Sequence, residues 1–332
     1  MNDPQSPSPP GTLPPAQPLS GAQPRPPTQA LPAAPADLGE PSDAEEVRRV
    51  VALMQMEPAG PDRFLAQSDN IGTMAVFGGQ VLGQALMAAW RTAPEGRIAH
   101  SLHAYFLLPG EHAPVTYEVE RVRDGRSFSM RRVVALQGGK TIFELLASFQ
   151  TRDTGWSHQT AMPEMPGPEG LADERIARHA VREKLPPYFH DKRLAPLGLE
   201  FRRVAPRDLL DPQPRTGPTC TWVRARGPLP DDPALHQALL AYGSDHELLT
   251  AANEPHGLTH FRGDARMASL DHAMWFHRDF RLDDWLLYQV ESPNAEGARG
   301  LALGRFYSRD GRLVASVAQE GMIRPWLKQP GG

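Results

Sequence analysis

Two polar side chains fall on otherwise apolar faces of predicted elements. Asp245 lies in the middle of the apolar stripe of a predicted helix, Leu239–Ala252. A carboxylate there must lose its water, which is rarely tolerated without a partner or a purpose. Gln319 interrupts an apolar row on the last predicted strand, and a buried amide needs hydrogen-bond partners. A carboxylate can take up a proton and an amide can hold a polar ligand, so both are candidate site residues.

Structural explanations exist for both residues. Asp245 can cap a neighbouring strand or pair with an arginine, and Gln319 can be a structural amide. Ser269, a third candidate, matches Ser101 earlier in the chain, so a turn role common to both positions explains it equally well. Gly78 and Gly79 open a predicted helix, where free N–H groups can bind an anion or an oxyanion. Glycine also lets the chain turn tightly into a helix, and both roles can hold at once.

A metal site is the alternative for Asp271, His272 and His277, because histidine and carboxylate are good zinc or iron ligands. On a strand, however, the spacing of the two histidines puts them on opposite faces. We therefore expect no metal and no redox cofactor. Cys220, the single cysteine, lies in an apolar strand-like stretch and is expected to be a structural thiol.

The elements that position these residues occur twice along the chain. The helix Phe77–Trp90 and the strands Ser127–Leu136 and Thr141–Gln150 are followed by a second helix and a second set of strands. The first helix contains no Asp or Glu, and Ala147 stands where the second copy has Gln319. The chemistry is therefore expected in the second copy. The matched segments are Ser101–Phe106 with Ser269–Phe276, Tyr117–Glu120 with Tyr288–Glu291, and Gly139-Lys140 with Gly311-Arg312.

Composition limits the partners and the compartment. The net charge of −4 over 332 residues gives no basic surface for nucleic acid. One cysteine excludes an intramolecular disulfide framework and suits a reducing cytoplasm. There is no apolar run of about 18 residues to span a membrane, and the N-terminus lacks the basic and apolar regions of a secretory signal. Residues 1–43 contain 13 of the 35 prolines and are expected to be disordered, with a helix capped by Ser42 beginning the ordered chain.

Five segments carry a resemblance to a known family: Phe77–Ala85, Arg123–Phe128, Ser244-Asp245, Asp271–His277 and Gln319–Gly321. Taken together, they resemble the acyl-CoA thioesterase II (TesB-like) family over roughly residues 45 to 326. The resemblance implies an α+β double hotdog, in which two antiparallel sheets are each wrapped around a central helix in one chain. It places an N-terminal hotdog at 44–152, a linker at 153–190 and a C-terminal hotdog at 191–328.

The resemblance also implies an activity, which is hydrolysis of acyl-CoA to a free fatty acid and CoA. The family's water-binding Asp and Gln map onto Asp245 and Gln319. Its Thr maps onto Ser269, a departure that keeps a hydroxyl group. Asp245 would take the proton from water, Gln319 and Ser269 would orient it, and an N–H near Gly79 would polarise the thioester carbonyl. By analogy we expect a homodimer or homotetramer.

Two other functions stay open on the sequence. A hotdog hydratase or dehydratase needs a histidine beside a carboxylate, and His246 next to Asp245 would supply it. A degenerate double hotdog could instead bind acyl-CoA without cleaving it. Chain-length preference is not readable, because the residues that line an acyl tunnel are distant in sequence.

Overall fold

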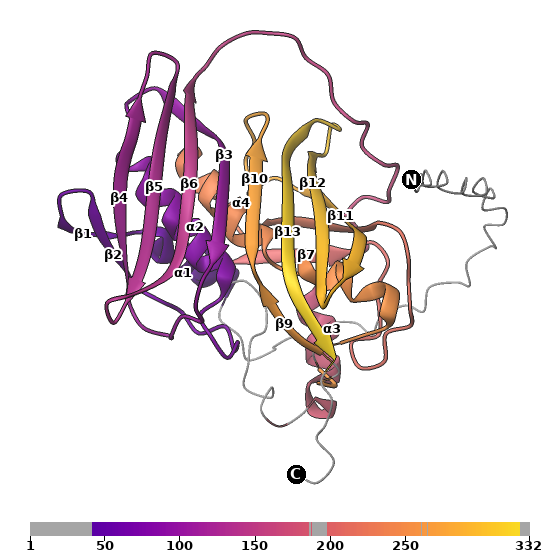
Figure 1. The fold of residues 1–332 in the computed structure, drawn as a ribbon. Coiled ribbons are helices and arrows are strands. Elements are labelled where there is room, and N and C mark those ends of the chain that lie inside the picture. Colours follow the sequence, from indigo (N-terminus) through magenta and orange to yellow (C-terminus); the bar gives the residue numbers. More distant parts are fainter. Residues whose placement is uncertain (1–41, 186, 188–197, 260, 264, 326–332) are drawn as a thin grey trace, which may run out of the picture. The chain divides into compact units, whose positions relative to one another are not determined.

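One antiparallel sheet is the scaffold of this computed structural model, which describes residues 42–185, 187, 198–259, 261–263 and 265–325. All of them belong to one compact unit of the chain. The strands pair in the order β1-β2-β4-β5-β6-β3-β10-β13-β12-β11-β8-β7, with β9 also on β13 (Figure 1). Their bounds are β1 Glu57–Gly60, β2 Arg63–Ala66, β3 Arg97–Phe106, β4 Val115–Asp124, β5 Phe128–Gln137, β6 Lys140–Thr151, β7 Leu199–Arg203, β8 Thr219–Ala225, β9 Ala265–Ser269, β10 Asp271–Phe276, β11 Leu286–Glu296, β12 Arg299–Ser308 and β13 Leu313–Pro325.

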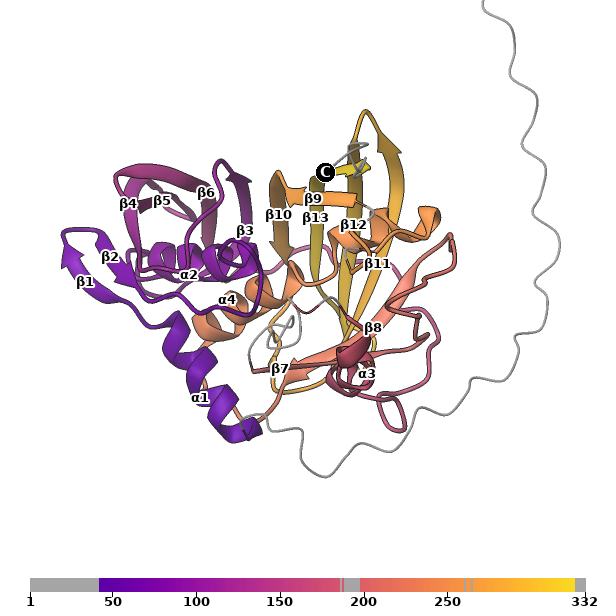
Figure 2. The ribbon, with the colours of Figure 1, turned by 90° about the horizontal axis from the view of Figure 1, so that it is seen from below.

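The helices α2 (Gly78–Trp90) and α4 (Pro233–Ser244) lie side by side against one face of this sheet, as seen from below in Figure 2. Almost every side chain of both helices is buried, which agrees with their apolar composition. α1 (Asp43–Met54) packs against both of them, whereas α3 (Glu174–Val181) contacts β7. Among the described residues there are also short 3₁₀ helices: η1 (Arg182–Lys184), η3 (Leu249–Ala252) and η4 (Glu254–His256). No helix in the described residues is both long and apolar enough to cross a membrane.

The repeat found in the sequence is also a repeat of strand order. Outwards from the centre, the first half runs β3, β6, β5, β4, β2, and the second runs β10, β13, β12, β11, β8. Matched residues keep matched roles, since Arg132 pairs with Glu120 in one half and Arg305 pairs with Glu291 in the other. The two halves therefore share one plan.

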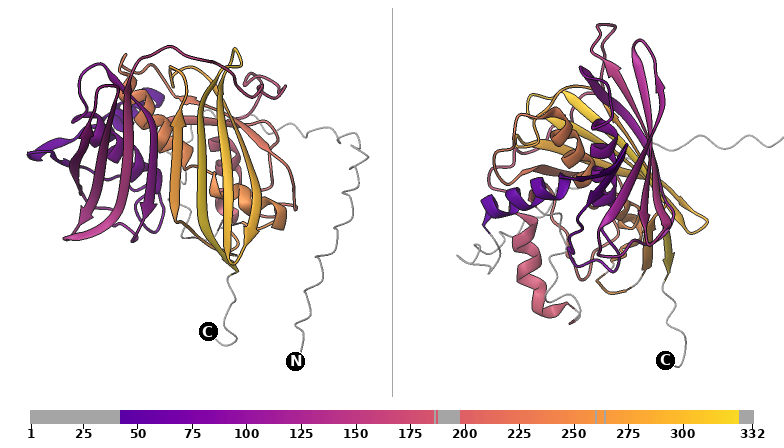
Figure 3. Two further views of the ribbon diagram at one scale, coloured as in Figure 1. Left: turned by 45° about the horizontal axis from the view of Figure 1, so that its top comes forward. Right: turned by 90° about the vertical axis from the view of Figure 1, so that its left-hand side faces the viewer.

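The two halves share a single sheet, where the sequence predicted two. The junction is the antiparallel pair β3–β10, two strands that lie side by side in Figure 3, left. In this pair Trp275 stands opposite Ser101, and Asp271 stands opposite Tyr105. The repeated segment Ser101–Phe106 thus pairs with its own second copy. Two edge strands of like pattern pair when they meet, because each otherwise exposes a row of unsatisfied N–H and C=O groups.

Most predicted elements are confirmed, with two exceptions near the candidate site. Ser42 caps α1 by accepting the Glu45 N–H, and α2, β5 and β6 have nearly the predicted bounds. The predicted helix Leu239–Ala252 is wrong, because α4 ends at Ser244 and η3 follows a turn. The sequence also predicts a strand from Met274 to Phe280, whereas β10 ends at Phe276. The predicted disordered tail lies outside the described residues, except for residues 42 and 43, which begin α1.

Glycine lets the two central helices approach closely. A Cβ atom at Gly83 would lie 2.8 Å from the Ala238 carbonyl oxygen, and one at Gly79 only 2.2 Å from that of Tyr242. These contacts show that α2 and α4 run antiparallel, with the N-terminus of α2 beside the C-terminus of α4. The first turn of α2 therefore lies where α4 ends.

The close approach predicts the effect of a methyl group at the crossing. Gly83→Ala should lower the free energy of unfolding by about 1–3 kcal/mol through overpacking, although alanine is the better helix former by about 1 kcal/mol. Gly155→Ala is the control, since its Cβ would meet nothing within 4 Å. Urea unfolding measures both, and equal stability of the two variants would contradict this packing.

Candidate active site

Asp245 is the residue that ends α4. It is the C-cap, with φ −72° and ψ −19°, so the prediction that it lies within a helix is wrong. Tyr288 Oη donates to the Ser244 carbonyl oxygen at 2.8 Å, an acceptor that a continued helix would offer to the Leu248 N–H. The helix stops there, and the Asp245 side chain, only 6% exposed, turns into the protein.

The Asp245 carboxylate binds the N-terminus of the helix from the other half. The Gly79 N–H donates to Oδ2 at 2.8 Å. The first amides of a helix have no intrahelical acceptor and carry its positive end, so they stabilise an anion. A Cβ at Gly78 would lie 2.9 Å from the same oxygen, which is why glycine is required there. The predicted anion site at Gly78 and Gly79 thus receives a carboxylate of the chain itself.

Gln319 and Ser269 complete the group. Gln319 Nε2 donates to Asp245 Oδ1 at 2.6 Å and to Ser269 Oγ at 3.0 Å. Ser269 reaches this position because β9 pairs with β13, where it stands opposite Gly321. Gln319 is fully buried, as its place on the apolar row predicted. The structure therefore brings together all three residues that the sequence selected, whereas Ala147 in the first half is equally buried and has no polar group.

His272 is a fourth polar residue at this site, which the sequence considered only as a metal ligand. Its Nε2 lies 3.0 Å from Ser244 Oγ, and that hydroxyl donates its one proton to the Ala241 carbonyl oxygen. Nε2 must then carry the hydrogen, which leaves Nδ1 as an acceptor 4.0 Å from Asp245 Oδ1. Burial lowers the pKa of His272 to about 4, against the opposing effect of the Asp245 charge, so the ring is neutral near pH 7.

Two acceptors around Asp245 lack a donor. Gln319 Oε1 and His272 Nδ1 are buried and have no hydrogen-bond partner among the described residues. Buried acceptors are normally satisfied, and an O–H of a bound water molecule can supply a missing donor. The site is therefore suited to hold a water molecule against a carboxylate.

The predicted metal candidates do not converge. His272 is buried at the site, but His277 binds Ser316 Oγ at 2.8 Å on the exposed side. Asp271 accepts the Glu320 N–H at 2.7 Å, and its half-buried position raises its pKa. The sequence argument that the two histidines face opposite ways is confirmed.

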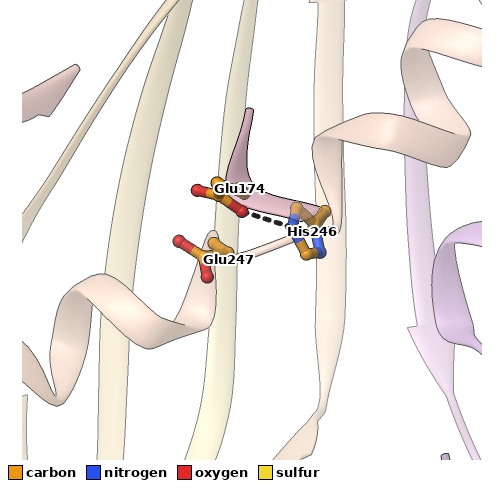
Figure 4. A group of neighbouring side chains, drawn as sticks. All are labelled: Glu174, His246 and Glu247. Carbon is orange, nitrogen blue, oxygen red and sulfur yellow. Dashed lines mark hydrogen bonds and ion pairs between the residues drawn. The ribbon is translucent and has the colours of Figure 1, made fainter. Parts of the chain in front are cut away.

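A different cluster, formed by Glu174, His246 and Glu247, has the spacing of metal ligands (Figure 4). Arginines already occupy it. Arg178 lies 3.1 Å from Glu174, and Arg203 forms ion pairs with Glu247 and, at 2.8 Å, with Glu254. Guanidinium groups on the same oxygens would repel a cation, so this is an ion-pair network.

The chain is similar to known acyl-CoA thioesterases over most of its length. A family model described as acyl-CoA thioesterase matches residues 214–322, and one described as acyl-CoA thioesterase N-terminal domain matches residues 66–150. The chain is 39% identical to acyl-CoA thioesterase 2 of Haemophilus influenzae over 84% of its length and 98% of that protein. It is 40% identical to acyl-coenzyme A thioesterase 8 of Homo sapiens, over 87% of its length and 92% of that protein.

Solved structures show the same fold. The acyl-CoA thioesterase II TesB2 from Mycobacterium marinum superposes with a TM-score of 0.69 at 41% identity, covering 83% of this chain and 98% of that one. A protein from Alicyclobacillus acidocaldarius, described as having a hot dog fold, superposes with a TM-score of 0.64 at 20% identity, covering 84% and 99%. The fold is therefore a hotdog fold. The chain belongs to the TesB-like acyl-CoA thioesterase II family.

The lowered pKa of His272 predicts how stability depends on pH. Unfolded histidine takes up a proton near pH 6.5 but folded His272 only near 4, so the unfolded chain binds more protons between these values. Stability is then lost as pH falls from 6.5 to 4, by about 3 kcal/mol from this residue. His272→Gln, which keeps a donor for Ser244, should lose about that much less over the same range.

Urea unfolding at several pH values measures this difference. His158→Gln is the control, because His158 is exposed and should leave the dependence unchanged. Equal acid sensitivity of the unmodified protein and His272→Gln would show that His272 is not buried in neutral form.

Proposed function

We propose that this protein, an acyl-CoA thioester hydrolase by family, cleaves fatty acyl-CoA with Asp245 as general base. The observation that carries the proposal is the position of the Asp245 carboxylate, held between the Gly79 N–H and the Gln319 amide with Ser269 beside it. Its side chain is almost fully buried, so a water molecule bound there competes with little bulk solvent. Thioester hydrolysis needs a water activated by a base, and this arrangement provides one.

Each residue then has a distinct task. Gln319 Nε2 and the Gly79 N–H fix the two carboxylate oxygens, while Gln319 Oε1 and the Ser269 hydroxyl orient the water. Asp245 accepts a proton as the water oxygen attacks the thioester carbonyl carbon. The tetrahedral oxyanion collapses, the C–S bond breaks, and the proton on Asp245 passes to the CoA sulfur. The products are a fatty acid and CoA thiol.

The oxyanion is assigned to the first turn of α2. Gly79 already donates to Asp245, so we assign the polarising N–H to Gly78, the first helical residue, whose amide has no intrahelical acceptor. Preorganised backbone donors of this kind stabilise the developing charge strongly because they need no reorganisation. The helix from the first half would then serve both the base and the substrate.

The repeated strand order supports a double hotdog as the finer description of the fold. Residues 44–152 and 191–328 would be the two hotdog units and 153–190 the connection between them. Within the connection, the Pro166 carbonyl oxygen accepts the Trp222 indole N–H at 2.8 Å. The Gln159 amide binds the turn between β12 and β13 through Gly311 and Leu313. The connection is thus hydrogen-bonded to the second unit.

The hydratase alternative loses its original support. His246 faces Glu174 and Arg178, at 3.4 and 3.1 Å, and its ring packs on Phe201 rather than beside the Asp245 carboxylate. His272 is the histidine near that carboxylate, but its donating nitrogen is held by Ser244. Formation of an enoyl product from a 3-hydroxyacyl-CoA, followed in the ultraviolet, would favour the hydratase over the hydrolase.

Removing the base gives the first test. Asp245→Asn should lower kcat by about 10²-fold or more, because an amide cannot take up the proton. Release of CoA thiol, followed with a chromogenic disulfide, measures turnover. The matched control is Asp232→Asn at the other end of α4, where Asp232 is the N-cap and asparagine caps equally well.

Two outcomes would contradict the proposal. Turnover by Asp245→Asn equal to that of Asp232→Asn would show that Asp245 is not the base. Binding of acyl-CoA by the unmodified protein without any thiol release would show a binding module in place of an enzyme.

The second test replaces Gln319 by the residue that the first half has at the matched position. Gln319→Ala introduces the residue found at the matched position, Ala147, and removes the donor to both Asp245 and Ser269. We expect kcat to fall by about 10²-fold, the cost of losing one preorganised donor. Ser269→Thr keeps the hydroxyl and should retain most of the activity. A Gln319→Ala variant as active as Ser269→Thr would exclude Gln319 from the site.

A further inference from the structure

The turn that follows Asp245 has an unusual backbone. Glu247, two residues after Asp245, has a φ of 62°, in the left-handed region that favours glycine. The other described non-glycine residues with positive φ, Asp62 and Ala298, lie in the hairpin turns β1–β2 and β11–β12, where this conformation is common. Glu247 lies in no hairpin, so something else must hold its backbone there.

Ion pairs hold the Glu247 side chain. Arg203, on β7, pairs with its carboxylate directly, while Arg207 and Arg178 approach to 3.4 and 3.7 Å. Burial alone would raise the pKa of Glu247, but the arginines, Arg203 foremost, hold it well below its usual value. The charge is therefore present in the folded protein and bound to a strand and to α3.

The preceding residue is held by the same network. His246 Nε2 contacts Glu174 and Arg178, both on α3, and its ring lies 4.5 Å from that of Phe201 on β7. Arg203 also binds Glu254 at 2.8 Å, in η4 beyond the turn. The chain on the C-terminal side of Asp245 is thus fixed from outside the site.

Asp245 needs such support because its own side chain is short. The hydrogen bonds to Gly79 and Gln319 come from α2 and β13, and both require the Asp245 backbone to end α4 in one orientation. A relaxed turn at Glu247 would move Asp245 away from these donors and from the water that it activates. Displacement of a catalytic group by about 1 Å can cost about 10²-fold in rate.

We propose that Glu247 is a positioning residue, held by Arg203 in a left-handed turn that directs the Asp245 carboxylate toward Gly79 and Gln319. The inference rests on the proposed function, since it assigns a task toward the same base. It also gives a role to α3, which lies in the predicted linker and contributes Glu174 and Arg178 to the network.

The test compares alanine with glycine at position 247. Both variants lose the ion pair, but glycine adopts a positive φ readily and alanine does not. Glu247→Ala should lower kcat by about 10²-fold, with KM for a saturated acyl-CoA nearly unchanged because no substrate contact is lost. Glu247→Gly should recover about fivefold to tenfold of that loss, in line with the lower cost of the left-handed conformation for glycine, and not all of it because the ion pair stays broken.

Glu254→Gln is the matched control. It removes the other close partner of Arg203 but lies outside the turn, so it should reduce stability while kcat stays within about threefold, the range of a change remote from the chemistry. Loss of kcat in Glu254→Gln equal to that in Glu247→Ala would show a merely structural network and overturn the proposal. Equal kcat values of Glu247→Gly and Glu247→Ala would also overturn the proposal.

Asp245→Asn, assayed in parallel, distinguishes a failure of the positioning role of Glu247 from a failure of Asp245 as the base. An inactive Asp245→Asn beside fully active Glu247 variants would overturn the positioning role alone. Full activity of Asp245→Asn would instead remove the proposed base. Should Glu247→Ala fail to fold, the kcat of Glu247→Gly against that of Glu254→Gln decides: a lower kcat with unchanged KM in Glu247→Gly supports positioning, and equal values overturn it.

Discussion

The burial of the Asp245 carboxylate is the constraint on which the rest of the structure depends. A charge removed from water needs donors, and its donors come from the other half of the chain and from the last strand. The Gly79 N–H can reach it only if α2 and α4 cross closely, which requires glycine at Gly78, Gly79 and Gly83. The single sheet holds both halves in register for this contact. The site is therefore shared between two copies of one unit.

Matched residues of the two copies have different hydrogen-bond partners. Tyr117 and Tyr288 are both fully buried, but the first donates to Gln84 and the second to the carbonyl oxygen that ends α4. The two central helices also end differently. α2 ends at Trp90, whose ring packs edge-on against Phe149, whereas α4 is followed by Asp245. The first half thus supplies a backbone donor from α2, and the second half supplies both Asp245 and the Gln319 donor.

Asp245 and Gln319 were predicted because each breaks an apolar pattern, and Ser269 was predicted from the family resemblance. The folded chain brings these three residues together. Prediction from the sequence failed where tertiary contacts override periodicity. The apolar stripe continues from α4 into η3, so periodicity gives no sign that the helix ends at Ser244. That end depends on the hydrogen bond from Tyr288 to the Ser244 carbonyl oxygen. The roles of His272 and Glu247 were invisible, because they depend on partners distant in sequence, Ser244 and Arg203. Periodicity also cannot tell one shared sheet from two.

The most direct measurement follows the oxygen of the attacking water. A single turnover of acyl-CoA in H₂¹⁸O, with mass spectrometry of the fatty acid and of the peptide that contains Asp245, separates general-base from covalent catalysis. If Asp245 activates water, the fatty acid carries the label and the Asp245 carboxylate carries none. Label in Asp245 would mean that this carboxylate attacks the thioester itself, which contradicts general-base catalysis by Asp245.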